Sequence, residues 1–173
     1  MNALLKNAAG SSKDLFTDLI VAELWQPLQL SPTAHYTRRT YDTTAQPFTG
    51  WGLIWLRDDV AKIGRFIGID AGAIGGSALL DRALFDAAMQ RNVDDRGTVP
   101  LADFRYNNGF WAHNVQQGLG CSNPTWVPFM SGFGGITVLL LPNDTVYYYF
   151  SDNDSHLWMD AARQSAKIRS ICH

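Results

Sequence analysis

The chain is poor in cysteine, in charge of either sign and in long hydrophobic runs. Its 173 residues include two cysteines, and 14 Lys and Arg against 16 Asp and Glu leave a formal net charge of −2. No long run of one charge occurs, so a surface for nucleic acid or anionic membrane is not expected. The longest run of mainly apolar residues, 136–141, is far too short to span a membrane. Residues 1–15 lack the apolar segment of a signal peptide.

Metal ligands and redox motifs are also missing. Cys121 and Cys172 form no C-x-x-C pair, and the four histidines lie without metal-ligand spacing: His35, His113, His156 and His173. We therefore expect no metal and no cofactor. The two cysteines form either one disulfide, as in an exported protein, or two buried thiols, and the sequence leaves both open.

Hydrophobic residues make up 46% of the chain and aromatic residues 12%, which is typical of a folded domain. Residues 1–100 are expected to be mainly helical. A capping-box pattern at Ser11–Asp14 predicts a helix that ends before Pro27, and further helices are expected from Asp58 and over 80–91. In the helix over 80–91, we expect Leu84, Ala87 and Ala88 to face the core.

Residues 101–173 are expected to form antiparallel strands and a closing helix. Runs of aromatic and β-branched residues predict four strands, at 108–115, 125–130, 135–141 and 145–150. A Pro-Asn-Asp turn at 142–144 joins the last two into a hairpin. The run 136–141, which is apolar except for Thr137, predicts a strand covered on both faces. The closing helix, 156–171, is expected to bury this stripe: Leu157, Ala161, Ile168 and Cys172. Helices, then a strand meander, then a helix indicate an α+β fold, an antiparallel sheet flanked by helices.

The last third resembles a known family. Trp126-Val-Pro-Phe-Met-Ser-Gly-Phe-Gly-Gly, followed by ITVLLLPNDTVYYYFSDN, is similar to the C-terminal part of serine β-lactamases and penicillin-binding proteins. The likeness is to the class C branch, with its D-aminopeptidases, DD-peptidases and esterases. Earlier strings fit the same order: Glu23-Leu-Trp-Gln-Pro-Leu, Trp51-Gly-Leu-Ile-Trp-Leu-Arg-Asp-Asp-Val-Ala-Lys-Ile-Gly and Tyr106-Asn-Asn-Gly-Phe-Trp. The resemblance implies that residues 1–173 are a single partial domain, the C-terminal part of a β-lactamase/transpeptidase-like fold.

The resemblance also implies site residues. Met130, Ser131 and Gly132 take the place of the family's third motif, which is a basic or His residue, then Ser or Thr, then Gly. The backbone N–H of Phe133 matches an oxyanion-hole donor, and Asn153 matches an Asn at the substrate rim. Methionine has no charge and forms no strong hydrogen bond. Met130 therefore argues against a carboxylate-bearing β-lactam as the substrate and favours an ester or an altered amide.

Two family motifs have no counterpart here. The chain contains no Ser-x-x-Lys, which carries the family's nucleophile. Its Ser-x-Lys strings, Ser11–Lys13 and Ser165–Lys167, place the two side chains about 200° apart on a helix, so we interpret these serines as a cap and part of a solvated face. Tyr106-Asn107-Asn108 spells the second motif, Tyr-x-Asn, but lies too near Met130, and we interpret it as a strand end before a turn.

The resemblance predicts that this chain is the C-terminal portion of a serine hydrolase, which cleaves amides, lactams or esters through an acyl-enzyme. Without upstream residues to complete the small-molecule site, we expect it to be inactive. The family's usual location implies a periplasmic or secreted protein. An alternative is a non-catalytic binding or oligomerisation module, which would form a homo-oligomer. A third hypothesis, an unrelated hydrolase using His113 or His156 with a nearby Asp, is weaker, because Asp152, Asp154 and His156 fit a surface cap.

Overall fold

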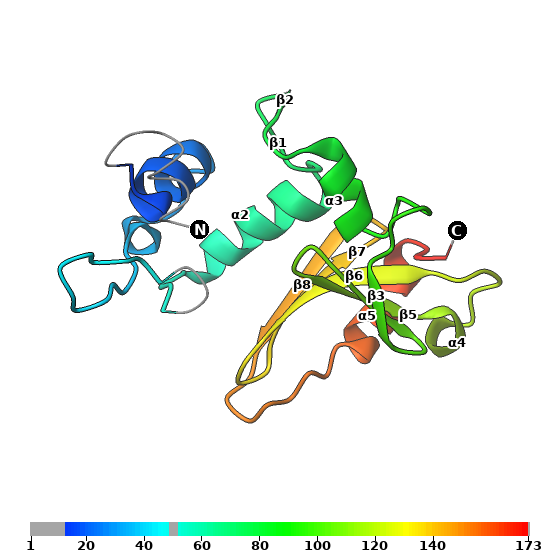
Figure 1. Ribbon diagram of the computed structural model, residues 1–173. Coiled ribbons are helices and arrows are strands. Elements are labelled where there is room, and N and C mark those ends of the chain that lie inside the picture. The colour runs from blue at the N-terminus through cyan, green and yellow to red at the C-terminus, as the bar shows by residue number, and fades with distance from the viewer. Residues whose placement is uncertain (1–12, 49–51, 173) are drawn as a thin grey trace. The chain divides into compact units, whose positions relative to one another are not determined.

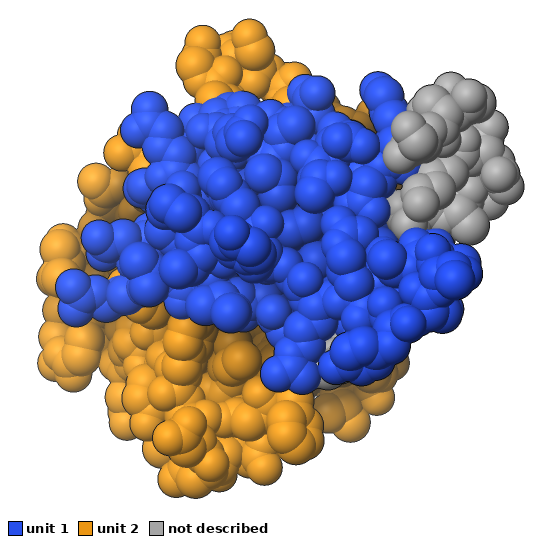
Figure 2. Space-filling view, turned by 90° about the vertical axis from the view of Figure 1, so that its left-hand side faces the viewer, with its two compact units in different colours: residues 1–63 blue, residues 64–173 orange. Residues whose placement is uncertain are grey.

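The computed structural model describes residues 13–48 and 52–172 (Figure 1). The chain mixes helices with an antiparallel six-stranded sheet, as the α+β expectation requires. It divides into two compact units, residues 1–63 and 64–173, which Figure 2 shows in different colours.

The first unit contains a π-helix, η1 (Leu15–Trp25), and a 3-10 helix, η2 (Pro32–His35). The η1 helix begins at Asp14, whose side chain accepts hydrogen bonds from the backbone N–H groups of Phe16 (3.0 Å) and Thr17 (2.9 Å). Both guanidinium NH2 groups of Arg39 also donate to this carboxylate, and that pairing holds the pKa of Asp14 far below its ordinary value. The expected cap at Ser11 lies outside the described residues.

A buried carboxylate, Asp59, organises the start of α2 (Arg57–Gly68). Asp59 is only 2% exposed and accepts hydrogen bonds from the N–H groups of Leu56 (2.9 Å) and Ser31 (2.7 Å), and from the Ser31 hydroxyl. Burial raises the pKa of Asp59, but the hydrogen bonds from Ser31 and Leu56 outweigh it, so the net shift is downward. The carboxylate therefore joins η2 to the first turn of α2.

We expect Asp59→Asn to lower the free energy of unfolding by about 2 kcal/mol, because the charged acceptor of three hydrogen bonds is lost. The lowered pKa stabilises the fold above the unfolded-state pKa of about 3.9, and this contribution is lost as the pH falls through the folded-state value. Urea unfolding at pH 7, 5 and 3 measures both effects, and the difference between variant and wild type should shrink at pH 3. Asp58→Asn, at the exposed neighbour, is the control. Equal effects of the two substitutions would contradict this role.

The second unit is built on a six-stranded meander in the order β3-β4-β5-β6-β7-β8, with every neighbouring pair antiparallel. The strands are β3 (Thr98–Leu101), β4 (Phe104–Asn107), β5 (Phe110–Asn114), β6 (Trp126–Gly132), β7 (Ile136–Leu141) and β8 (Thr145–Phe150). The remaining elements are β1 (Ala73–Ile74), β2 (Ser77–Ala78), α3 (Arg82–Ala88), α4 (Gln116–Leu119) and α5 (Met159–Ile168). Strands β5 to β8 match the four predicted ones, whereas β3 and β4 were not predicted, because β3 is exposed along its length and shows no apolar alternation.

The sheet has a core on each face, since neighbouring residues of β7 point in opposite directions. Leu139 and Leu141 pack in a cluster with Trp158 and Ala162 of the α5 segment. On the other face, Leu140 packs with Phe85 and Ala88 of α3 and with Met89, which follows that helix. The prediction that this strand is covered on both faces is confirmed for residues 138–141 but is wrong for Ile136, which is 43% exposed at the open end of the strand.

The inner faces of two helices differ from the predictions. In α3, Leu84 is exposed and Phe85 is buried beside Ala87 and Ala88. Leu157, just before α5, and Ile168 (89% exposed) face solvent. Trp158 and Ala162, each one residue after a predicted position, are buried instead, and so is Ser165. A shift of one residue turns a helix by about 100°. In both cases an aromatic ring, Phe85 or Trp158, takes the core position, because it buries more apolar surface than the neighbouring leucine.

Ser165 is buried in the structure, contrary to the prediction that it belongs to a solvated face. Its hydroxyl accepts a hydrogen bond of 2.9 Å from the side-chain amide of Asn143. The same amide donates to the carbonyl of Arg169 (2.8 Å). The turn between β7 and β8 is therefore bonded to the end of α5.

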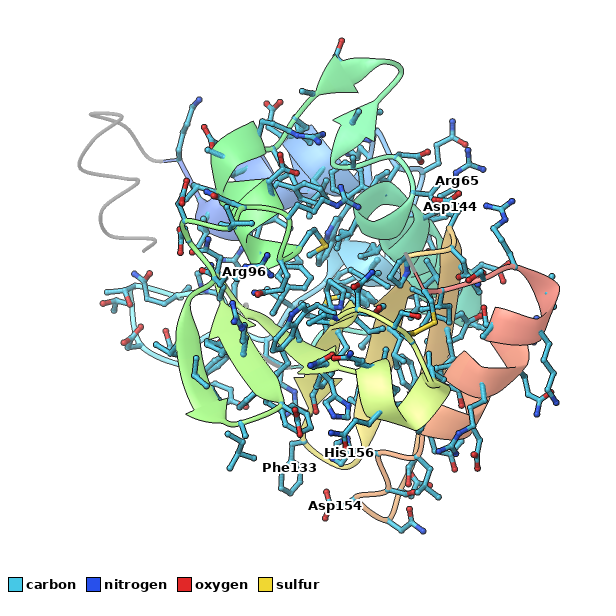
Figure 3. All side chains as sticks on the ribbon, turned by 90° about the vertical axis from the view of Figure 1, so that its right-hand side faces the viewer. Arg65, Arg96, Phe133, Asp144, Asp154 and His156 are labelled. Carbon is cyan, nitrogen blue, oxygen red and sulfur yellow. A yellow bond between two sulfur atoms is a disulfide. The ribbon has the colours of Figure 1, made fainter. Side chains whose placement is uncertain are left out.

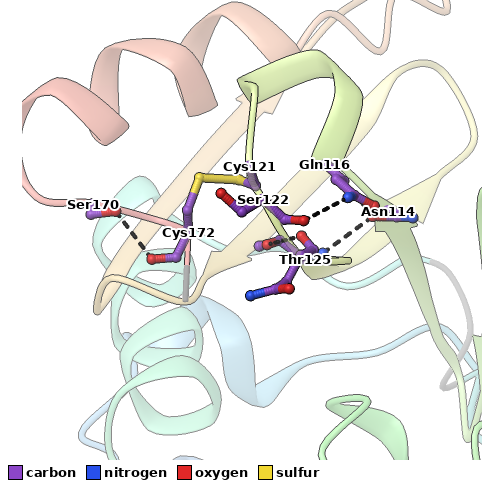
Figure 4. Close-up of a disulfide and its surroundings, with 8 residues drawn as sticks. Asn114, Gln116, Cys121, Ser122, Thr125, Ser170 and Cys172 are labelled. Atoms are coloured by element: carbon purple, nitrogen blue, oxygen red, sulfur yellow. Dashed lines mark hydrogen bonds between the residues drawn. A yellow bond between two sulfur atoms is a disulfide. The ribbon is translucent and has the colours of Figure 1, made fainter.

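Cys121 and Cys172 are joined in a disulfide (Figure 4). Cys121 follows α4, and Cys172 lies in the segment after α5, next to the fully buried Ile171. The bond closes a loop across 51 positions of sequence and attaches the C-terminal segment to the sheet unit. Of the two alternatives left open by the sequence, the structure contains the disulfide.

Candidate functional site

Met130, Ser131 and Gly132 form the last three positions of β6, and their backbone has an open edge. They pair with Val138, Thr137 and Ile136 of β7. On the other side, the ladder to β5 ends one position earlier, at Trp111↔Phe129. No described strand pairs with Met130–Gly132 on that side. This short stretch can therefore offer backbone groups to a ligand in the way that an unpaired strand edge does.

A glycine turn follows the open edge. Phe133 is 95% exposed at its tip, and Gly134 and Gly135 have φ of 82° and 86°, a backbone region that favours glycine. The Asp154 carboxylate accepts a 3.0 Å hydrogen bond from the Gly134 N–H, and the Gly135 carbonyl accepts one from Ser151. Figure 3 shows Phe133, Asp154 and His156 at the same end of the sheet.

Asn153 lies in the loop that supports this turn. Its side-chain oxygen accepts hydrogen bonds from the Ser151 hydroxyl and from the Ser155 N–H (3.3 Å). The carbonyl end of the side chain is therefore engaged within the loop 151–155. The loop in turn contacts Gly135, where a β-carbon would come within 2.9 Å of Ser151 and Ser155.

The structure adds His156 to this group. Its Nδ1 lies 3.2 Å from the Thr137 hydroxyl oxygen and 3.5 Å from the Ser131 hydroxyl oxygen. Ser131 and Thr137 are cross-strand partners, so their side chains share one face of the sheet. The alternation of side chains along paired strands could have predicted that these two hydroxyls lie on one face. No signal in the sequence predicts that the loop carrying His156 lies beside them.

His156 also lines a surface cavity of about 440 Å³ together with a second histidine, His113. The His113 ring stacks on Phe104 with centroids 4.2 Å apart and meets Trp158 edge to face. Burial lowers the pKa of His113, while the Asp103 carboxylate opposes that shift only in part. The lowered pKa favours the neutral form of His113, whose ring belongs to an aromatic cluster.

The arrangement does not assemble a Ser-His-Asp relay from the nearby acids. Asp154 binds the Gly134 N–H, and no hydrogen bond joins it to His156 among the described residues. Over the same residues, no group of three His, Cys, Asp or Glu side chains is placed to hold a metal ion. Chemically, the site offers hydroxyls, an imidazole and a strand edge.

The Tyr-x-Asn string spans the end of β4, with Tyr106 and Asn107, and the turn to β5, with Asn108. Tyr106 packs edge to face on Trp111, with ring centroids 5.1 Å apart. Asn107 is buried and donates to Asp95, and Asn108 has φ of 48° ahead of Gly109, the geometry of a tight hairpin turn. Each residue of the string therefore has a local structural role.

Comparison with known proteins adds no relative. No protein-family model matches the chain, and a search of curated proteins finds no match. Among the described residues, no helix is long and apolar enough to cross a membrane.

Proposed function

We propose that this chain is the C-terminal part of a serine hydrolase of the β-lactamase and penicillin-binding family, with the corresponding fold. The observation that carries the proposal is the end of β6, where Met-Ser-Gly has an open backbone edge and runs into a Gly-Gly turn. The resemblance places the third motif at this position. A hairpin and a closing helix follow in the order that the family has.

In the proposed enzyme, this chain forms one wall of the pocket. The Phe133 N–H stabilises the oxyanion of the tetrahedral intermediate, and the Ser131 hydroxyl, beside His156, faces the leaving group or the substrate rim. The serine nucleophile and its lysine base come from residues outside this sequence. Because Met130 brings no positive charge, the preferred substrates are esters or altered amides rather than lactams with a carboxylate.

The test is covalent labelling. The 173-residue chain should not react with a fluorescent penicillin or a fluorophosphonate, because it lacks the Ser-x-x-Lys motif. In source cells, an antibody against α5 should detect a product of roughly twice 19.2 kDa, and that band should react with one of the two probes. A stoichiometric adduct on the 173-residue chain, or an unlabelled band at 19.2 kDa, would overturn the proposal.

A second candidate is a non-catalytic module that forms a homo-oligomer. The observation in its favour is β8, an outer strand of the sheet with no charged residue or proline in its six positions. Such an edge, when exposed, pairs readily with another strand. Sedimentation of the purified chain distinguishes the candidates: a stable dimer supports the module, and a monomer counts against it.

A further inference from the structure

A second cavity, of about 250 Å³, opens at the other end of the sheet unit. Its walls come from the residues after α3, from Trp126 at the start of β6, and from Leu141 at the end of β7. Met130–Gly132 lie at the opposite ends of these strands. The cavity is therefore separate from the candidate site described above.

The charged lining of this cavity is mainly positive. Arg91 and Arg96 both line it, and the guanidinium of Arg105 lies over the Trp126 ring, 4.4 Å from its centroid. Arg96 makes no ion pair in the described part of the chain. Arg91 has only a long contact of 3.9 Å with Asp86, whose other oxygen binds Arg82 at 2.7 Å.

The one acidic lining residue does not neutralise these arginines. Asp144 is paired with Arg169 at 2.7 Å, and Figure 3 shows it well apart from Arg96. Burial and the positive charge of Arg96 both lower the pKa of Arg105. Arg96 therefore has no ion-pair partner among the described residues and Arg91 has only the long contact with Asp86, an arrangement that a bound anion would stabilise.

Gln90 provides a hydrogen-bond acceptor in the same cavity, whereas the arginines provide donors. It lines the cavity, is only 6% exposed, and donates from Nε2 to the carbonyl of Arg96 (3.3 Å). That bond leaves Oε1 as the remaining acceptor, and Oε1 is buried with no donor among the described residues. Gln90 also has φ of 60°, unusual for a residue other than glycine, so its backbone is held in a costly conformation. A buried acceptor without a donor is unfavourable unless an occupant of the cavity supplies one.

We infer that this cavity binds a small organic anion with an N–H donor next to its carboxylate, with the carboxylate at Arg96 and Arg91 and the N–H at Gln90 Oε1. An acylated amino acid, or the carboxyl terminus of a peptide, has this chemistry. The volume, about 250 Å³, lies below the range of pockets for drug-sized ligands and limits the bound part to a small molecule. This binding site is independent of the hydrolase proposal.

The probes are N-acetylglycine, N-acetylsarcosine and inorganic phosphate, titrated into the full chain and followed by NMR of the arginine Nε–H and tryptophan indole N–H groups. N-acetylglycine should shift the Arg96 and Trp126 signals saturably. N-acetylsarcosine, which has the carboxylate but no N–H, should bind several-fold more weakly, because Gln90 Oε1 stays without a donor. Phosphate should be weaker than N-acetylglycine for the same reason.

The variants test the arginines. Arg96→Gln should weaken N-acetylglycine binding roughly tenfold, the usual effect of losing a charge-assisted hydrogen bond, and Arg91→Gln should act in the same direction. Arg163→Gln, at an arginine that lines the cavity beside His156, is the matched control and should leave the affinity unchanged. Circular dichroism at each step shows that the variants are folded. Absence of saturable shifts, equal binding of the two acetylated probes, or wild-type affinity in both cavity variants would overturn the inference.

Discussion

Replacing Cys121 and Cys172 together with serine is expected to lower the free energy of unfolding by about 4 kcal/mol. The disulfide spans 51 positions, and opening a loop of that length restores much conformational freedom to the unfolded chain. The folded state also loses the attachment of the C-terminal segment, which carries the buried Ile171. The effect is large compared with the total stability of a typical domain.

Chemical denaturation with and without a thiol reductant measures this effect. The wild type should unfold at a lower denaturant concentration when reductant is added, and the double serine variant should not respond to reductant. A wild-type midpoint that is the same in both conditions would contradict the prediction. Retention of the C-terminal segment can be followed separately by limited proteolysis after α5, where the reduced protein should be cleaved faster.

Gly135→Ala is expected to have the second-largest effect, lowering the free energy of unfolding by about 3 kcal/mol or more. Gly135 has φ of 86°, which is unfavourable for alanine. An added β-carbon would also lie 2.7 Å from the Ser155 carbonyl oxygen and 2.8 Å from the Ser151 Cβ, so the loop 151–155 would have to move. That loop carries Asn153 and leads to His156, and the substitution should therefore also disturb the contact of His156 with Ser131 and Thr137.

The adjacent glycine provides the control. Gly134 has nearly the same φ, 82°, but its nearest neighbour for an added β-carbon is 3.8 Å away. Gly134→Ala should cost only the conformational term, about 1 kcal/mol. Urea unfolding of both variants, together with the NMR signals of His156, separates the steric effect from the backbone effect. Similar losses in both variants would show that the contacts of Gly135 contribute nothing.

Local signals in the sequence predicted some elements well, among them the last hairpin and one helix. The hairpin of β7 and β8 follows from two runs of strand-forming residues around Pro142-Asn143-Asp144, and the structure has both strands within one residue of the predicted bounds. The helix that begins near Asp58 was also predicted from the sequence, because its apolar residues recur at helical spacing. These features depend on neighbours in sequence, so sequence was sufficient.

The sequence did not predict correctly which residues of α3 and α5 face the core. Leu84 and Phe85, like Leu157 and Trp158, are adjacent apolar residues, and either member of each pair gives an acceptable helical stripe. Only the packing against β7 selects Phe85 and Trp158. The buried role of Ser165 likewise depends on Asn143, which is 22 positions away.

The sequence by itself determined the order of helices, strands and closing helix, the last four strands of the meander and the glycine turn after Ser131. These features follow from periodicity, turn residues and backbone freedom. Only the tertiary structure decided which residues meet. It joined Cys121 to Cys172, placed His156 beside Ser131, and brought Gln90, Arg91 and Arg96 around one cavity. The physical reason is that such contacts depend on the folding of distant segments over a common sheet, and the free energy that selects them comes from burial of the core, not from any local pattern.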